Sequence, residues 1–154
     1  MTAMRGPKRR EYPGFVAMIR DADGKPVNLH RTYLTVAGDK ADIPEPRRVM
    51  DTKLPKGCAV RLWPYETVLG VAEGLENAES CRLMFGIPTW SLINAQNMRG
   101  FIPPKDVRKL VIFGDLDHSY TGQAASFDLA RTLWAQRTQW DPPLEVEVRI
   151  PGLT

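Results

Sequence analysis

Two aspartates follow an apolar segment that has the composition of a buried strand. The run 107–113 leads through Gly114 into Asp115-Leu-Asp117. Residues two apart in an extended backbone point to the same side, so these carboxylates lie close and repel each other unless a cation separates them. A divalent metal ion is the usual cation in such a place. The alternative is a helix N-terminus with acidic capping residues, where carboxylates interact favourably with free N–H groups.

A second acidic pair occupies an equivalent place earlier in the chain. The segment 67–72 is a candidate buried strand, Glu73-Gly74 ends it, and Glu76 can share a helix face with Glu73. Ligands of open α/β sheets bind at the carboxyl ends of the strands. Carboxylates gathered there suit Mg²⁺, for which Mn²⁺ can substitute. Such a site supports phosphoryl chemistry, because the ions neutralise phosphate charge and lower the pKa of an attacking hydroxyl.

The pattern of residues 66–154 predicts the elements that position these carboxylates. Alternation of strands with helices predicts a parallel sheet flanked by helices, with the final strand at an edge. We expect strands at 67–72, 89–93, 107–113 and 144–150, helices at 75–85 and 120–139, and a helical turn at 96–99. The apolar stripe of the later helix is predicted at Ala124, Phe127, Ala130, Leu133 and Trp134.

The first third of the chain has a different character. Residues 15–65 predict a small, basic, antiparallel β-rich subdomain, which begins with a hairpin of two strands, 15–20 and 27–34, around an Asp-Gly turn. Short strands are expected at 48–50 and 58–62. Residues 1–14 predict a flexible basic segment.

Charge is divided unevenly between the two parts. Residues 1–65 carry thirteen Lys/Arg and seven Asp/Glu, whereas residues 66–154 carry eight and eleven. A basic part beside an acidic part suits a protein that holds a polyanion with one and metal ions with the other. An uneven but merely solvated surface would give the same counts.

Several classes of protein are excluded by what the sequence lacks. No apolar run reaches membrane-spanning length, and no apolar core follows the basic first residues as in a signal peptide. The two cysteines, Cys58 and Cys81, cannot form a four-ligand zinc site, so no zinc is expected. A Gly-rich phosphate loop ending in Lys-Ser/Thr is missing too, which argues against a helicase half.

The two acidic motifs together resemble the Toprim domain, which topoisomerases, bacterial-type primases and some nucleases share. Glu73-Gly-Leu-Glu76 and Gly114-Asp-Leu-Asp117, with the small-residue helix entry Thr121-Gly-Gln, are most similar to the Toprim primases of phages and plasmids. The run 30–34, His-Arg-Thr-Tyr-Leu, also resembles the strand before Toprim in that group. The resemblance implies a Toprim-like Rossmannoid sheet over residues 66–154.

The resemblance also implies roles. Glu73 would be the general base or acid and help to hold metal, Asp115 and Asp117 would bind Mg²⁺, and Glu76 would be a further metal ligand. The reaction would be nucleotidyl transfer from NTPs on a single-stranded DNA template. Candidate nucleic-acid or NTP contacts are Arg31, Lys40, Arg47, Arg48, Lys53, Arg61, Asn94 and Asn97.

We therefore expect a DNA primase catalytic core that makes short RNA primers in the cytoplasm of a bacterium or of the bacterial host of a mobile element. A replicative helicase, or further domains of a longer primase, would be partners; a membrane would not. A catalytic-core fragment alone is expected to be weakly active. Two alternatives stay open: a metal-dependent Toprim nuclease, and a non-catalytic module that binds nucleic acid.

Overall fold

A single mixed sheet organises the part of the chain that the computed structural model describes, residues 11–50 and 53–151. Residues 1–10 of the expected flexible segment 1–14 lie outside the described residues. The strand order is β3-β2-β1-β4-β6-β5-β7-β8. The strands are β1 (Gly14–Arg20), β2 (Pro26–Tyr33), β3 (Arg47–Val49), β4 (Ala59–Val60), β5 (Val68–Ala72), β6 (Thr89–Ser91), β7 (Lys109–Phe113) and β8 (Glu145–Arg149).

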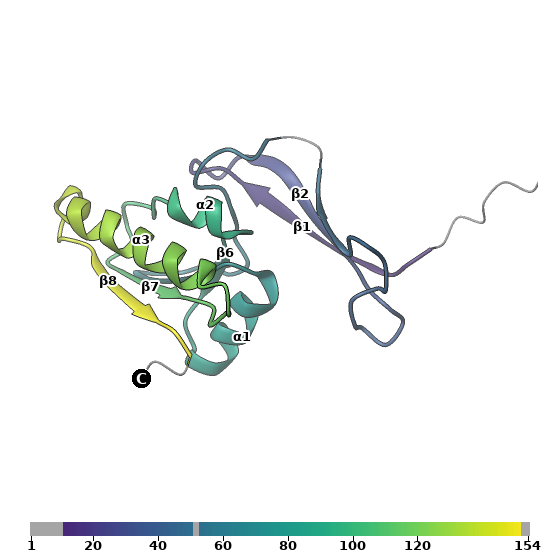
Figure 1. Ribbon diagram of the computed structural model, residues 1–154. Coiled ribbons are helices and arrows are strands. Elements are labelled where there is room, and N and C mark those ends of the chain that lie inside the picture. The colour runs from purple at the N-terminus through teal and green to yellow at the C-terminus, as the bar shows by residue number, and fades with distance from the viewer. Residues whose placement is uncertain (1–10, 51–52, 152–154) are drawn as a thin grey trace, which may run out of the picture.

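The second half of the sheet consists of the parallel strands β5 to β8 and lies between helices; we call it the parallel half. Strand β5 pairs in parallel with β6 and β7, and β7 pairs in parallel with β8 at the edge. Helix α1 (Leu75–Phe85) covers one face, whereas α2 (Ala95–Arg99) and α3 (Thr121–Gln136) cover the other (Figure 1). The predicted α/β fold with flanking helices is therefore confirmed. No helix within the described ranges is long and apolar enough to span a membrane.

The basic first part of the chain, up to residue 65, continues the same sheet with antiparallel strands, and we call it the hairpin part. Strands β1 and β2 form the predicted hairpin, and β3 pairs with the outer side of β2. Strand β4 links this part to the parallel half through one pair, Val60 with Ser91. The link is reinforced by a cluster in which Ala17 and Ile19 of the hairpin pack with Leu75 of α1. The division into subdomains at residue 65 stays a prediction.

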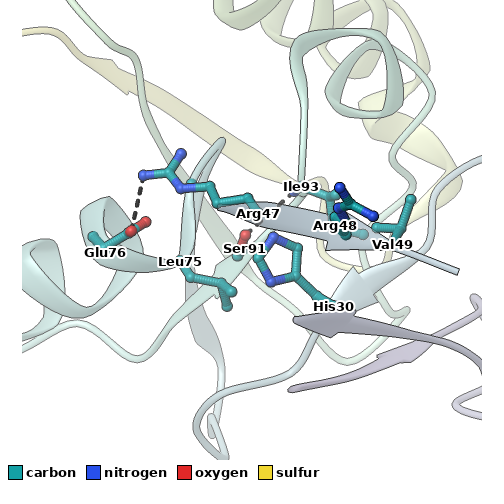
Figure 2. Close-up of a pocket in the computed structure, with 9 residues that line it drawn as sticks. His30, Arg47, Arg48, Val49, Leu75, Glu76, Ser91 and Ile93 are labelled. Atoms are coloured by element: carbon teal, nitrogen blue, oxygen red, sulfur yellow. Dashed lines mark hydrogen bonds and ion pairs between the residues drawn. The ribbon is translucent and has the colours of Figure 1, made fainter. Parts of the chain in front are cut away.

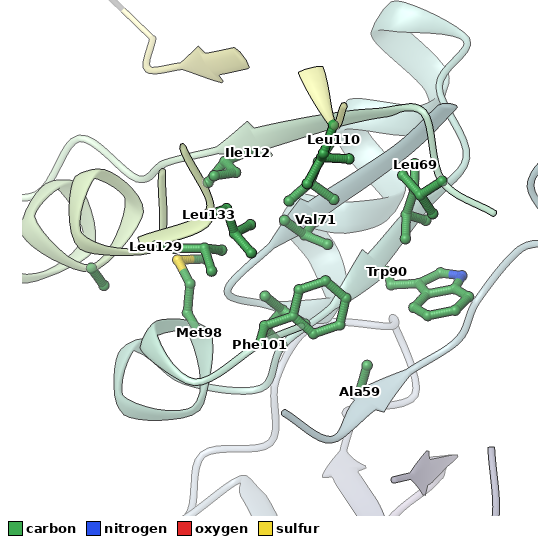
Figure 3. Close-up of a cluster of buried hydrophobic side chains, with 14 of the residues drawn as sticks. Ala59, Leu69, Val71, Trp90, Met98, Phe101, Leu110, Ile112, Leu129 and Leu133 are labelled. Carbon is green, nitrogen blue, oxygen red and sulfur yellow. The ribbon is translucent and has the colours of Figure 1, made fainter. Parts of the chain in front are cut away.

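The main core lies under α2 and α3 (Figure 3). Alternate residues of β5 and β7, Leu69, Val71, Leu110 and Ile112, meet Leu129 and Leu133 of α3 there. The other face of these strands packs on α1 through Val111, Phe113 and Ala78. Burial on both faces explains why both strands read as continuous apolar runs.

The predicted apolar stripe of α3 was wrong in most positions. The helix buries Gly122, Gln123, Ala125, Ser126, Leu129 and Leu133. Ala124, Phe127 and Trp134 are exposed instead, with Phe127 at 52% and Trp134 at 57%. Small polar residues occupy the inner face because α3 lies close to the sheet. A side chain on Gly114 would come within 2.7 Å of the Ser126 hydroxyl, which donates a hydrogen bond to the Gly122 carbonyl inside the helix.

Gly70 in the middle of β5 is required for close packing. A Cβ there would meet the Thr89 hydroxyl oxygen at 2.4 Å and the Phe113 ring at 3.0 Å. We predict that Gly70→Ala lowers the free energy of unfolding by about 1–3 kcal/mol, the usual cost of overpacking. Urea denaturation measures the change.

Gly14→Ala is the matched control, because the nearest atom to a Cβ at that strand position is 3.6 Å away. Thr89→Ala should restore part of the stability lost in Gly70→Ala. Equal stabilities of the Gly70 and Gly14 variants would contradict the packing described for β5.

Candidate active site

Three carboxylates meet at the carboxyl ends of β5 and β7. Ala72 pairs with Phe113 in the sheet, so Glu73 and Asp115 follow neighbouring strand ends. Burial raises the pKa of Glu73, and the charges of Asp115 and Asp117 raise it further. The Ala95 N–H and the Arg47 charge lower that pKa. Glu73 is thus close enough to Asp115 and Asp117 for their charges to oppose its ionisation.

Asp117 is held by the first turn of α3. Its carboxylate accepts hydrogen bonds from the Ser119 hydroxyl at 2.7 Å and from the Gly122 N–H at 3.0 Å. These contacts, the Ser119 hydroxyl first, lower the pKa of Asp117. A Cβ on Gly122 would lie 3.0 Å from the Asp117 Oδ2 atom and 3.1 Å from the Asp115 Cβ. Glycine at this position therefore lets the helix start directly against both aspartates.

Two positioning residues were not predicted from the sequence. The Asn77 amide donates a hydrogen bond to the Asp115 Oδ1 atom at 2.6 Å, and the Ser91 hydroxyl donates one to the Glu73 carbonyl at 2.9 Å. The signal for Asn77 was its place in the first turn of a helix that begins at an acidic strand end. Ser91 also accepts a bond from the N–H of Ile93, whose φ of 75° is unusual for a β-branched residue.

The carboxylates fit a hard divalent ion by their chemistry. All three offer oxygen atoms, and Mg²⁺ is commonly bound by only one or two carboxylates together with water and substrate phosphate. Among the described residues, no group of three or more His, Cys, Asp or Glu side chains is placed so that it could hold a metal ion. An ion at these strand ends would therefore need oxygen atoms from water or a ligand as well.

Glu76 forms ion pairs with two cations of the basic first part. Its Oε1 atom is 2.8 Å from an Arg47 guanidinium nitrogen and 3.6 Å from the Lys40 Nζ atom. Burial acts to raise the pKa of Glu76, but its own backbone N–H, the Arg47 charge and the Lys40 charge lower it, and the result lies below the usual value. Arg47 and Glu76 line a pocket of about 210 Å³ between β2, β3 and the start of α1 (Figure 2).

Two further basic candidates, Arg31 and Arg48, belong to the other face of the hairpin sheet. They are paired across β2 and β3, whereas His30 and Arg47 alternate with them. The Arg48 guanidinium binds the Glu45 carboxylate at 3.3 Å, although the residue forms part of the wall of the pocket. Lys53 is exposed on the loop after β3.

The remaining candidates hold the fold together. Arg61 donates hydrogen bonds to the carbonyls of Asp21 and Ala22 in the hairpin turn and stacks over Trp90. Asn94 caps α2 by accepting a bond from the N–H of Asn97.

Asn97 itself is buried, and both of its amide atoms are used inside the protein. Its Nδ2 donates to the carbonyls of Cys58 and Leu92, and its Oδ1 accepts from the Gly57 N–H. No side-chain polar atom of Asn97 is left for a ligand.

Comparisons with known proteins show what the chain and its fold resemble. Residues 68–140 match the family model of the Toprim domain, and residues 2–62 match that of a domain of unknown function, DUF7146. A crystal structure of a DNA primase domain from Pseudomonas aeruginosa superposes with a TM-score of 0.57 at 13% sequence identity. The match covers 93% of this chain and 44% of the primase-domain chain. A comparison with curated protein sequences gave no match.

Ionised Glu73 should cost stability at neutral pH. The folded protein binds its proton more tightly than the unfolded chain does, because burial and two carboxylates raise its pKa. This contribution to stability is present below the unfolded pKa, about 4.3, and is lost as pH rises through the folded pKa. We predict that Glu73→Gln unfolds at higher urea than the wild type at pH 7, with the difference vanishing in acid.

Glu66→Gln, which removes one exposed carboxylate, is the matched control for net charge. A Glu73→Gln variant that is less stable than the wild type at pH 7 without divalent metal would show that the carboxylate is not opposed by its surroundings.

Gly122 should be required for the positions of the Asp115 and Asp117 carboxylates rather than for the stability of α3. Alanine normally favours a helix over glycine by up to about 1 kcal/mol, but here its methyl group would push on Asp115 and Asp117. We predict that Gly122→Ala weakens Mn²⁺ binding by about 10–100-fold, as lost support of metal ligands does. Electron paramagnetic resonance titration measures Mn²⁺ affinity.

Ala124→Gly, on the exposed face of the same helix, is the control. It should lower stability and leave Mn²⁺ affinity unchanged. If both variants bound Mn²⁺ like the wild type, Gly122 would have no part in supporting the site.

Proposed function

With a Toprim domain at residues 68–140 as the premise, we propose that this chain is the catalytic core of a DNA primase of the phage or plasmid type. The reaction would be nucleotidyl transfer: a ribonucleotide 3′-hydroxyl attacks the α-phosphate of an incoming NTP on single-stranded DNA, and pyrophosphate leaves. The observation that carries the proposal is the convergence of Glu73, Asp115 and Asp117 at neighbouring strand ends, beside cations from the hairpin part.

Each residue has a proposed task. Asp115 and Asp117 would hold Mg²⁺, supported by Asn77 and by the N-terminus of α3. The bound ion supplies charge neutralisation at the phosphates and acidifies the attacking hydroxyl. Glu73 would accept the hydroxyl proton, a task that its raised pKa suits.

The basic part would bind the polyanions. Arg47 and Lys40 lie on the side of the sheet that faces α1, close enough to the acidic strand ends for the Arg47 charge to act on Glu73. They are the proposed phosphate contacts. Arg31, Arg48 and Lys53 are exposed or half-buried on the same part and are proposed to contact the template strand. A replicative helicase or further primase domains would be partners in the bacterial cytoplasm.

Primer synthesis is tested directly by incubating the chain with single-stranded DNA, labelled NTPs and Mg²⁺ or Mn²⁺. We predict labelled oligoribonucleotides, and a loss of about 10²–10⁴-fold in their rate for Glu73→Gln, the usual contribution of a general base. Asp115→Asn should lose at least as much. The matched control is Asp128→Asn, which removes a half-exposed carboxylate from α3.

The other outcomes separate the alternatives. Shortening of the DNA without primers would identify a Toprim nuclease that uses the same carboxylates. DNA binding without either product would identify a non-catalytic module. Undiminished primer synthesis by Asp115→Asn would remove Asp115 from the metal site.

A further inference from the structure

The pocket beside Glu76 has the size and lining of a small-anion site. It is bounded by the hairpin part on one side and by Gly74, Leu75 and Ser91 of the Toprim domain on the other (Figure 2). Its volume of about 210 Å³ is below the roughly 300–1,000 Å³ of pockets that hold drug-sized ligands. A phosphate or diphosphate group would fit better than a whole nucleotide.

Two cations converge on a single carboxylate oxygen of Glu76, which lines this pocket together with Arg47, whereas Lys40 approaches the same oxygen from outside the lining residues. Arg47 and Lys40 both point to the Glu76 Oε1 atom, at 2.8 and 3.6 Å. All three side chains are nearly half exposed, at 43%, 49% and 49%. Ion pairs as exposed as these add little to stability, so an anion with more charge can displace the carboxylate at small cost. A phosphate also matches the planar fork of an arginine.

His30 adds an independent sign of a ligand. It lines the same pocket, only 8% of its surface is exposed, and its Nδ1 atom is buried without a hydrogen-bond partner. Leaving such a group unsatisfied is unfavourable. Of the buried side-chain atoms that lack a partner in the described residues, only the one on His30 belongs to this pocket. Its strand partner is Val49, which is two residues from Arg47 and on the same face of β3, so the imidazole and the guanidinium reach the pocket from adjacent strands.

We propose that a diphosphate group binds at this pocket through Arg47, Lys40 and His30. Glu76 forms ion pairs with Arg47 and Lys40 until the diphosphate displaces its carboxylate. The choice of a diphosphate, as pyrophosphate or as the terminal part of an NTP, rests on the proposed function. Glu76 is then a competing anion rather than a metal ligand. The acidic strand ends hold the metal, while the hairpin side holds the far end of the phosphate chain.

The test is calorimetric titration of the full chain with sodium pyrophosphate in EDTA at constant ionic strength. Glu76→Gln should bind pyrophosphate about three- to tenfold more tightly than the wild type, because a competing exposed ion pair and a nearby negative charge are both removed. Arg47→Gln should bind at least about tenfold more weakly, as expected for a lost charged hydrogen bond. His30→Gln should also bind more weakly.

Matched controls change the same charges elsewhere. Glu79→Gln lies one helical turn from Glu76 and loses a carboxylate that pairs with Arg82. Arg99→Gln loses a cation that pairs with Asp128. Neither should change pyrophosphate affinity by more than about twofold, the size of a weak exposed ion pair. Circular dichroism confirms that the buried His30 variant is folded, and the exposed Arg47 variant tests the pocket in any case.

Several results would overturn the proposal. Pyrophosphate affinity that falls or stays the same in Glu76→Gln would show that Glu76 does not compete for the site. Equal effects of Arg47→Gln and Arg99→Gln would show only general charge attraction. The pocket and the proposed activity can be rejected independently. The predicted changes in pyrophosphate affinity without primer synthesis would reject the primase. Primer synthesis without those changes in affinity would reject the pocket.

Discussion

Opposition to the ionisation of Glu73, from burial and from the charges of Asp115 and Asp117, is the constraint on which the candidate site depends. Three carboxylates at adjoining strand ends are unfavourable by themselves, so each is fixed by a separate support. Ser91 binds the backbone at Glu73, Asn77 binds the Asp115 carboxylate, and the first turn of α3 binds Asp117. These supports come from three different elements. The site therefore exists only when the parallel half of the sheet and both of its helical layers are assembled.

The single sheet also determines where the positive charge lies. Strand β4 carries the sheet from the parallel half into the hairpin part, and the hairpin turns one face toward α1. Side chains alternate along β3, so Arg47 pairs with Glu76 of α1 whereas Arg48 pairs with Glu45 of its own part. A shift of one residue in this register would exchange the two. The strand pairing, and not the number of basic residues, thus selects the cation that meets the acidic strand ends.

Several features near the site oppose stability, as is usual for functional regions. The surroundings of Glu73 oppose its ionisation and raise its pKa, Ile93 has a left-handed backbone, and His30 has a buried nitrogen without a partner. All three lie around the junction of the hairpin part with the parallel half. Within the parallel half, β5, β7 and the inner face of α3 are closely packed, with glycines where the layers approach most closely. Among the described residues of that inner face, the buried Gln123 Oε1 atom also lacks a hydrogen-bond partner.

The sequence by itself determined the elements and the acidic strand ends, because these depend on local patterns: apolar runs for β5 and β7, a terminal glycine for α1, and carboxylates directly after the strands. Only the tertiary structure decided the partners. Glu76 met Arg47 and Lys40, Arg61 and Asn97 bound backbone groups, and α3 buried Ser126 while exposing Phe127. These outcomes depend on strand order, register and the distance between layers, which join residues far apart in the chain. The type of a side chain and its place in the sequence indicate which groups it can bind. Which of those groups lie beside it is determined by the fold.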